Sequence, residues 1–128
     1  VSHQSIPFTK PHLTGLELDL ISQALQENQL HGPGLITRKC HQELEKLSGC
    51  SKALLTNSCT AALEMSTLLA NIQAGDEVIL PSFTFVSTAN SIVLQGGVPV
   101  FINIRPDTFN IDEAKIEEAI TPKTKAIL

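Results

Sequence analysis

Residues 53–62 read ALLTNSCTAA, which is the most informative stretch of the chain. Its apolar start predicts a short buried strand over Ala53–Thr56, and small or hydroxyl-bearing residues then lead directly into a predicted helix over Cys59–Asn71. A strand that passes straight into a helix is the repeating unit of α/β proteins, in which helices connect parallel strands. The stretch therefore predicts an α/β fold with a mostly parallel sheet and flanking helices.

The same alternation continues toward the C-terminus. Strands are predicted over residues 77–80, 98–104 and 125–128, and helices over residues 85–94 and 110–120, with Asn110 as the cap of the last helix. The chain stops inside the last predicted strand, where a domain boundary would be unusual. We therefore expect residues 1–128 to be the truncated N-terminal portion of a larger domain.

Two helices are predicted before this alternating segment. Thr14 and Glu17 have the spacing of a capping box, and apolar residues then recur at helical spacing, which predicts a helix over residues 14–28. A turn rich in glycine and proline follows. The next predicted helix covers residues 37–48 and ends at Gly49.

Composition excludes several classes of partner. The chain has 9 basic and 13 acidic residues, a net charge of -4 and no run of like charge, so neither nucleic acid nor an anionic membrane is an expected partner. Its apolar runs are far shorter than the roughly 20 residues that cross a bilayer, and its start is not a signal peptide, which predicts a soluble cytoplasmic protein. Three cysteines without a C-x-x-C pair and four histidines without ligand spacing predict neither disulfides nor a metal site.

The start of the helix at Cys59 is a candidate phosphate site. Unpaired N–H groups at a helix start attract anions together with the helix dipole, and the hydroxyls of Ser58 and Thr60 could add donors. The alternative is that Asn57 or Ser58 only caps the helix, since capping is far commoner than ligand binding. The chain has neither a G-x-x-x-x-G-K-[ST] loop nor a G-x-G-x-x-G turn, which disfavours nucleoside triphosphates and dinucleotides.

A second candidate feature follows the next predicted strand. Residues 81–90 read PSFTFVSTAN and lie at the carboxyl end of that strand, where ligands of open α/β sheets bind. Two of the five phenylalanines, Phe83 and Phe85, are here, and an aromatic face beside a phosphate site could stack on a flat heterocycle. Alternatively, both rings pack in the core.

Several motifs, taken in order, resemble those of the DegT/DnrJ/EryC1/StrS family of sugar aminotransferases. The resemblance covers the whole chain and is specific, because long motifs recur in the same order. They are residues 6–8 (IPF), 32–38 (GPGLITR), 58–65 (SCTAALEM), 75–79 (GDEVI), 81–90 (PSFTFVSTAN), 105–108 (RPDT) and 110–112 (NID).

This resemblance implies a fold-type I transferase that uses pyridoxal 5'-phosphate. The reaction implied is amination of a nucleotide-linked 4-keto-6-deoxy sugar with glutamate as the donor, by a homo-oligomer. By the same resemblance, Thr60 and Ala61 bind the cofactor's phosphate and Phe85 stacks on its pyridine ring. Residues 32–37 would border the sugar-nucleotide end of the site.

The catalytic lysine of such an enzyme is not expected in this chain. Transamination needs a Schiff-base lysine that also carries the proton, and an acidic partner for the pyridine nitrogen. In the family both lie downstream of the stretch matched here. None of the seven lysines stands in the family's lysine motif, and all are predicted to be surface charges: Lys10, Lys39, Lys46, Lys52, Lys115, Lys123 and Lys125.

Two other classes of function remain open from the residues alone. One is a non-catalytic α/β module that binds a small phosphate ligand or a partner protein. The other is a cysteine-dependent enzyme, because Cys59 stands at a predicted helix start, a position that favours reactive thiols. No base for such an enzyme is evident in the sequence, and Cys59 is predicted instead to be a small packing residue.

Overall fold

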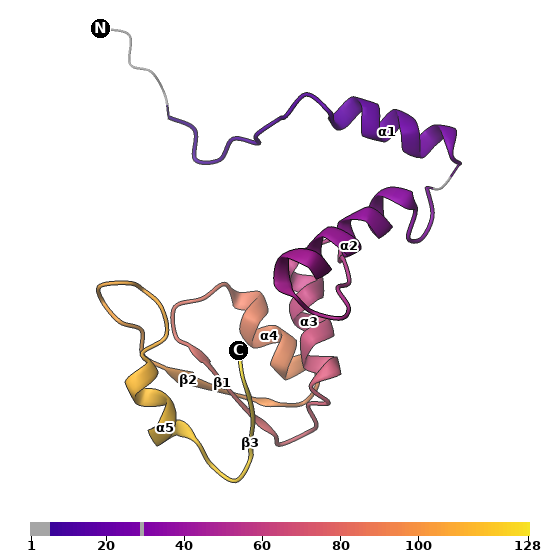
Figure 1. Cartoon of the computed structure of the whole chain (residues 1–128). Helices are drawn as coiled ribbons and strands as arrows, with labels where there is room; N and C mark the ends of the chain where they lie inside the picture. Colours follow the sequence, from indigo (N-terminus) through magenta and orange to yellow (C-terminus); the bar gives the residue numbers. More distant parts are fainter. Residues whose placement is uncertain (1–5, 29) are drawn as a thin grey trace, which may run out of the picture. The chain divides into compact units, whose positions relative to one another are not determined.

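The computed structural model describes residues 6–28 and 30–128. The chain divides into two compact units, Val1–Leu55 and Thr56–Leu128. The first contains helices α1 and α2, and the second contains the sheet and the remaining helices (Figure 1). All three residues predicted to contact a cofactor belong to the second unit.

Both helices predicted for the first unit are confirmed. Helix α1 spans Glu17–Gln26 and α2 spans Leu35–Ser48. The Glu17 carboxylate accepts a hydrogen bond from the N–H of Thr14 at 2.7 Å, which is one half of the predicted capping box. Helix α2 ends at Gly49 as predicted, with φ of 70°, a left-handed conformation that glycine adopts without strain.

The predicted strand over Ala53–Thr56 is wrong. Its first residues lie along α2, where the N–H of Ala53 donates to Glu45 Oε1 at 3.2 Å and the N–H of Leu55 donates to His41 Nε2 at 3.0 Å. A strand exists only beside another strand that pairs its backbone groups. Among the described strands none pairs with this segment, and side chains of α2 satisfy its N–H groups instead.

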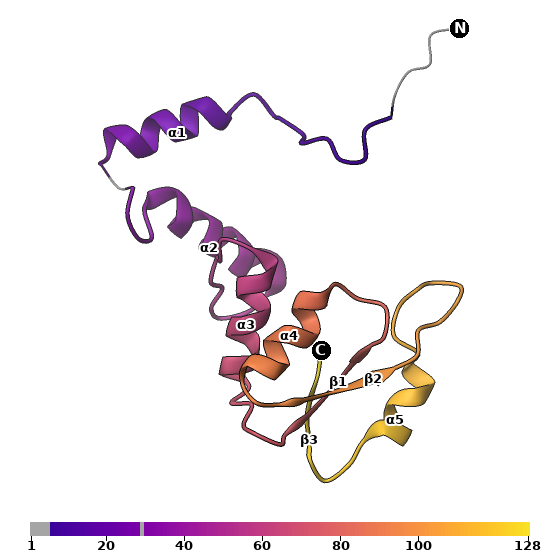
Figure 2. The ribbon, with the colours of Figure 1, turned by 180° about the vertical axis from the view of Figure 1, so that it is seen from behind.

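The second unit is an α/β layer structure, which confirms the predicted fold class. Strand β1 lies in the middle of the sheet and pairs in parallel with β2 on one side and β3 on the other. Figures 1 and 2 show α4 on one face of this sheet and α5 on the other, as expected when successive right-handed crossovers run in opposite directions. The elements are α3 (Cys59–Leu69), β1 (Glu77–Pro81), α4 (Val86–Leu94), β2 (Val98–Ile102), a 3-10 turn η1 (Glu113–Lys115), α5 (Ile116–Ala119) and β3 (Thr124–Ile127).

The predictions over residues 98–120 need correction. Strand β2 ends at Ile102, and the predicted helix over 110–120 is reduced to η1 and α5. Asn110 does not cap this helical segment. Its backbone carbonyl oxygen accepts from the N–H of Arg105 at 2.9 Å, and the neighbouring bridge between Ile104 and Ile111 keeps the backbone there extended. The cap is Asp112, whose carboxylate accepts from the N–H of Ala114 at 3.3 Å.

The core lies between the sheet and α4. Val78 and Leu80 of β1 are fully buried and pack with Ile92 of α4 and with Ile72. Gly97 passes so close to this cluster that a Cβ there would lie 2.7 Å from Ile72 Cγ2. This packing fixes the position of α4 on the sheet. The start of α4 follows β1 after a short loop.

Candidate functional site

The start of α3 is built by a serine cap. Ser58 is the N-cap, and its side-chain oxygen accepts a hydrogen bond from the N–H of Ala61 at 3.1 Å. Its carbonyl oxygen accepts from the N–H of Ala62 at 3.1 Å. The alternative that Ser58 caps the helix is therefore confirmed, and one of the N–H groups at the helix start already has an acceptor within the chain.

Thr60 offers two donors at the same helix start. It is exposed, and within the described part of the chain its N–H has no hydrogen-bond partner. Its hydroxyl oxygen lies 2.9 Å from Ser87 Oγ, a residue of α4 that is distant in sequence. This contact brings the start of α3 beside the start of α4.

Phe85 stands at the start of α4, and its ring is exposed to solvent. It is the N-cap residue of that helix and is 75% exposed, and Phe83 is 67% exposed. The alternative that these two rings pack in the core is therefore wrong for this structure. The loop before α4 is held by its own hydroxyls, because Thr84 Oγ1 lies 2.9 Å from Thr88 Oγ1.

A loop after β2 adds a third aromatic ring. Phe109 has φ of 59°, an uncommon conformation for a residue that is not glycine, and its ring centroid lies 5.9 Å from that of Phe83. The N–H of Phe109 donates to the carbonyl oxygen of Arg105 at 2.9 Å, which closes the loop. The tilted pair of rings connects this loop to the one that carries Phe85.

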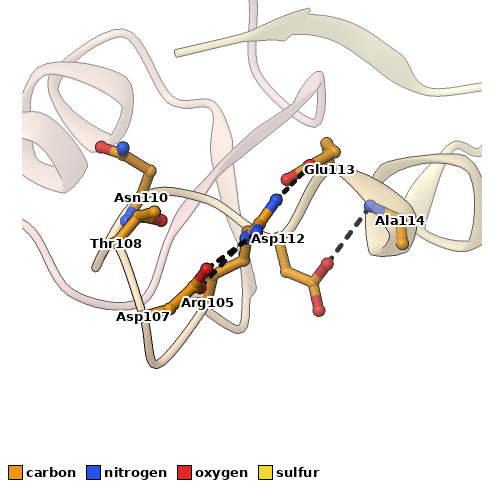
Figure 3. Close-up of polar contacts among 7 residues, drawn as sticks. All are labelled: Arg105, Asp107, Thr108, Asn110, Asp112, Glu113 and Ala114. Carbon is orange, nitrogen blue, oxygen red and sulfur yellow. Dashed lines mark hydrogen bonds and ion pairs between the residues drawn. The ribbon is translucent and has the colours of Figure 1, made fainter.

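The side chain of Arg105 stabilises the same loop by binding two carboxylates (Figure 3). Its Nε and Nη2 donate to the two oxygens of Asp107 at 3.1 and 2.8 Å, and its Nη1 donates to Glu113 Oε1 at 2.7 Å. These bonds raise the pKa of Arg105, through Asp107 first and Glu113 second, and the guanidinium lowers the pKa of Asp107. The pKa of Glu113 is also lowered, first by its own backbone N–H and then by Arg105. All three groups are thus charged at neutral pH, and the loop gains an ion-pair network rather than a reactive group.

Three residues near the candidate site were not singled out from the sequence. Ser87 and Arg105 stand inside motifs of the family resemblance, and Phe109 stands between two of them. No local pattern predicts the contacts of Ser87 and Phe109. The partner of Ser87 is 27 residues away, and the ring of Phe109 meets Phe83 through a turn that propensities do not indicate. A local signal was available only for Arg105, because Asp107 two residues later is a nearby opposite charge.

Other chemistry-bearing groups lie apart from this arrangement. All seven lysines are exposed, as predicted, and their lack of a catalytic role stays a prediction. Cys59 is exposed, so its prediction as a packing residue is wrong. Within residues 6–28 and 30–128, no group of three or more His, Cys, Asp or Glu could hold a metal ion. In the same residues, no helix has the length and apolar character to cross a membrane.

The segment predicted to border a sugar nucleotide belongs to the first unit. Gly32, Gly34 and Thr37 line a hollow of about 240 Å³ in that unit, together with Ala24 and Glu27 of the region around α1. Among the described residues that line this hollow, none is positively charged. The role of residues 32–37 therefore stays a prediction.

Comparison with known proteins identifies the family. The sequence model of the DegT/DnrJ/EryC1/StrS aminotransferase family matches residues 11–128. The spore coat polysaccharide biosynthesis protein SpsC of Bacillus subtilis (strain 168) is 37% identical over 123 residues, which cover 96% of this chain and 31% of the relative. GDP-perosamine synthase of Caulobacter vibrioides is 35% identical over 123 residues, or 96% of this chain and 33% of the relative.

A solved structure gives the same result. The putative sugar aminotransferase Spr1654 from Streptococcus pneumoniae, in its PLP form, superposes with a TM-score of 0.88 and 34% identity over 97% of this chain and 31% of that protein. The chain thus spans about a third of the length of the relatives it matches. It belongs to the DegT/DnrJ/EryC1/StrS aminotransferase family.

Proposed function

We propose that this chain provides the phosphate-binding and ring-stacking part of a pyridoxal-phosphate-dependent sugar aminotransferase. The substrate class is a nucleotide-linked 4-keto-6-deoxy sugar, with glutamate as the amino donor. Family membership supports the proposal, and so do the PLP and PMP forms of Spr1654 and the name of the relative GDP-perosamine synthase. The proposal includes assembly with a second copy of the chain and a cytoplasmic location.

The hydrogen bond between Thr60 and Ser87 is the observation that carries the proposal. At 2.9 Å it joins the starts of α3 and α4, so the N–H and hydroxyl of Thr60 and the exposed ring of Phe85 belong to neighbouring helix starts. A phosphorylated pyridine needs both kinds of group, donors for its dianionic phosphate and an apolar face for its ring. The residues present therefore fit the cofactor.

Each residue has a defined part in holding the cofactor. The N–H and hydroxyl of Thr60 donate to phosphate oxygens, aided by the positive end of the α3 dipole. In this structure the N–H of Ala61 donates to Ser58 Oγ. It would donate to the phosphate either by sharing its proton between the two acceptors or by giving up the bond to Ser58. Phe85, whose ring is exposed, would cover one face of the pyridine ring.

The chemistry itself is supplied by the cofactor, which when bound acts as an electron sink for transfer of the amino group. The residues of this chain bind and orient it. Proton transfer requires a positioned amine. None of the seven exposed lysines of this chain is proposed for that task.

A binding comparison tests the proposal. Pyridoxamine 5'-phosphate and pyridoxamine differ only in the phosphate, and neither carries the aldehyde that reacts with surface lysines. Each is titrated into the ¹⁵N-labelled 128-residue chain and followed by amide chemical shifts. We expect the phosphorylated compound to bind more tightly and to shift the amides of Thr60 and Ala61 most strongly, because these groups donate to the phosphate.

Matched variants separate the ring from the phosphate. Phe85→Ala should weaken binding of both compounds, because both contain the pyridine ring, whereas Phe83→Ala removes a similarly exposed ring and should change binding less. Equal affinity of the wild-type chain for the two compounds would contradict the proposed phosphate site. Phosphate-dependent binding that Phe85→Ala leaves unchanged would instead favour the non-catalytic module that binds a small phosphate ligand.

A further inference from the structure

We infer that Ser87 is a positioning residue for the cofactor phosphate, acting through the hydroxyl of Thr60. This inference rests on the proposed function and adds to it a residue that does not touch the ligand. Ser87 Oγ holds Thr60 Oγ1 at 2.9 Å and sets the direction in which the Thr60 proton points. Thr60 then donates to a phosphate oxygen.

The position of Ser87 supports this role. It is the second residue of α4 and only 8% exposed, so its hydroxyl is confined at the contact between α4 and α3. Within the described part of the chain, the Ser87 hydroxyl forms a hydrogen bond with Thr60 alone. Thr60 itself is exposed and open to a ligand. Ser87 is therefore the buried residue that positions the Thr60 hydroxyl, and Thr60 is the exposed residue that binds the phosphate.

The number of protons on the two hydroxyls sets which of them donates when a phosphate is bound. Each hydroxyl has one proton, and in the pair as it stands either oxygen could be the donor. A phosphate dianion accepts hydrogen bonds and donates none, so Thr60 must use its proton on the phosphate. The proton between the two hydroxyls must then come from Ser87. Such a chain polarises the Thr60 O–H bond and strengthens the bond to the anion.

The surroundings favour a phosphate at the start of α3 over one between the two helices. Thr60 and Ser87 both line a hollow of about 210 Å³ that is also lined by Glu64, one turn further along α3. A carboxylate on that wall repels an anion, whereas the unpartnered N–H of Thr60 attracts one. When Ser87 donates to the oxygen of the Thr60 hydroxyl, the Thr60 proton is available for a ligand at the start of α3.

A double-mutant cycle tests the inference. The affinity for pyridoxamine 5'-phosphate is measured for the wild-type chain, Ser87→Ala, Thr60→Val and the double variant. We expect Ser87→Ala to weaken binding about twofold to tenfold, the range that corresponds to one net hydrogen bond. The same substitution should have no effect in the Thr60→Val background, and pyridoxamine without phosphate should bind all four chains alike.

Control variants separate positioning from general stability. Ser66→Ala removes a comparable hydroxyl from α3, one that donates to the Leu63 carbonyl oxygen at 2.7 Å, and should leave phosphate-dependent binding unchanged. Circular dichroism and melting temperature check that Ser87→Ala is folded. If it is not, Ser87→Cys keeps nearly the same volume and replaces the hydroxyl with a weak donor, so it should show the same loss.

The outcomes distinguish this inference from the proposed function. If the wild-type chain prefers pyridoxamine 5'-phosphate but Ser87→Ala binds it as tightly, only the inference is overturned. It is also overturned if Ser87→Ala weakens binding equally with Val at position 60, because the effect would then not pass through the Thr60 hydroxyl. If the wild-type chain shows no preference for the phosphate, the proposed function fails first and the inference fails with it.

Discussion

Thr67 joins the two helices that carry the candidate site, and replacing it with valine tests that junction. Thr67 is 2% exposed, and its one hydroxyl proton is shared between two acceptors, the Ser91 carbonyl oxygen of α4 at 3.1 Å and the Glu64 carbonyl oxygen of its own helix at 2.9 Å. Near the end of α4 the N–H of Gln95 donates to Ile92 rather than to Ser91. Thr67 thus gives the Ser91 carbonyl oxygen a donor in place of the Gln95 N–H.

The structure sets the magnitude of the effect. Valine has nearly the shape of threonine, so Thr67→Val creates almost no cavity but leaves the buried Ser91 carbonyl without this donor. A lost hydrogen bond that leaves a buried group unsatisfied costs about 1–3 kcal/mol. Thr67→Ser is the matched control, because it keeps the hydroxyl and removes one buried methyl group, at about 1 kcal/mol.

Urea unfolding followed by far-UV circular dichroism measures both variants, since the chain has no tryptophan or tyrosine to report by fluorescence. Hydrogen exchange at the amides of α3 and α4 assigns the loss to the second unit. We expect Thr67→Val to be less stable than Thr67→Ser, with faster exchange in both helices. A valine variant as stable as the wild-type chain would refute the reasoning, because the hydroxyl would then contribute nothing across the helix contact.

Four further predictions address other parts of the chain. Gly97→Ala places a Cβ 2.7 Å from Ile72 Cγ2 and should destabilise the second unit by about 1–3 kcal/mol in the same urea assay; an unchanged midpoint would contradict the packing. Hydrogen bonds, first that from the Thr14 N–H, lower the pKa of Glu17 from 4.5 to about 2, so its support of α1 is complete above pH 4.5 and is lost as the pH falls through about 2. Carboxyl NMR titration checks this, and Glu17→Gln should remove the pH dependence. Arg105→Gln should let the Asp107 pKa rise toward its ordinary value, which the same titration measures. Incubation with pyridoxal 5'-phosphate and borohydride should give only scattered, substoichiometric labelling of the seven lysines by peptide mass mapping, and stoichiometric labelling of one lysine with glutamate-dependent turnover would show that the chain does hold the catalytic amine.

Local patterns in the sequence were sufficient for the class of fold and for several helix ends. The alternation of apolar segments with helical periodicity indicated the parallel sheet, because both periods arise from the geometry of a single element. Ser58 and Gly49 were recognisable as helix ends, since a cap depends on a few neighbouring residues. Thr60 was a candidate because it stands at a predicted helix start, and Phe85 because it follows a predicted strand. The family resemblance gave each its specific role.

The tertiary structure decided whatever depends on partners far away in the chain. Residues 53–56 have the composition of a strand, but pairing needs a neighbouring strand, and the N–H groups of Ala53 and Leu55 meet side chains of α2 instead. Asn110 has the chemistry of a cap, yet its backbone is taken by pairing with Arg105. Such outcomes depend on which distant group satisfies a backbone N–H or carbonyl, and no local pattern records that choice.

The candidate site shows the same division. Its residue types, small and hydroxylic at one helix start and aromatic at the next, are evident in the sequence. Only the folded chain brings Thr60 within 2.9 Å of Ser87 and the Phe109 ring to Phe83, because these contacts depend on how α3, α4 and the loop after β2 pack on the sheet. The sequence thus determined which groups are available for binding, and the packing of distant segments decided which of them act together.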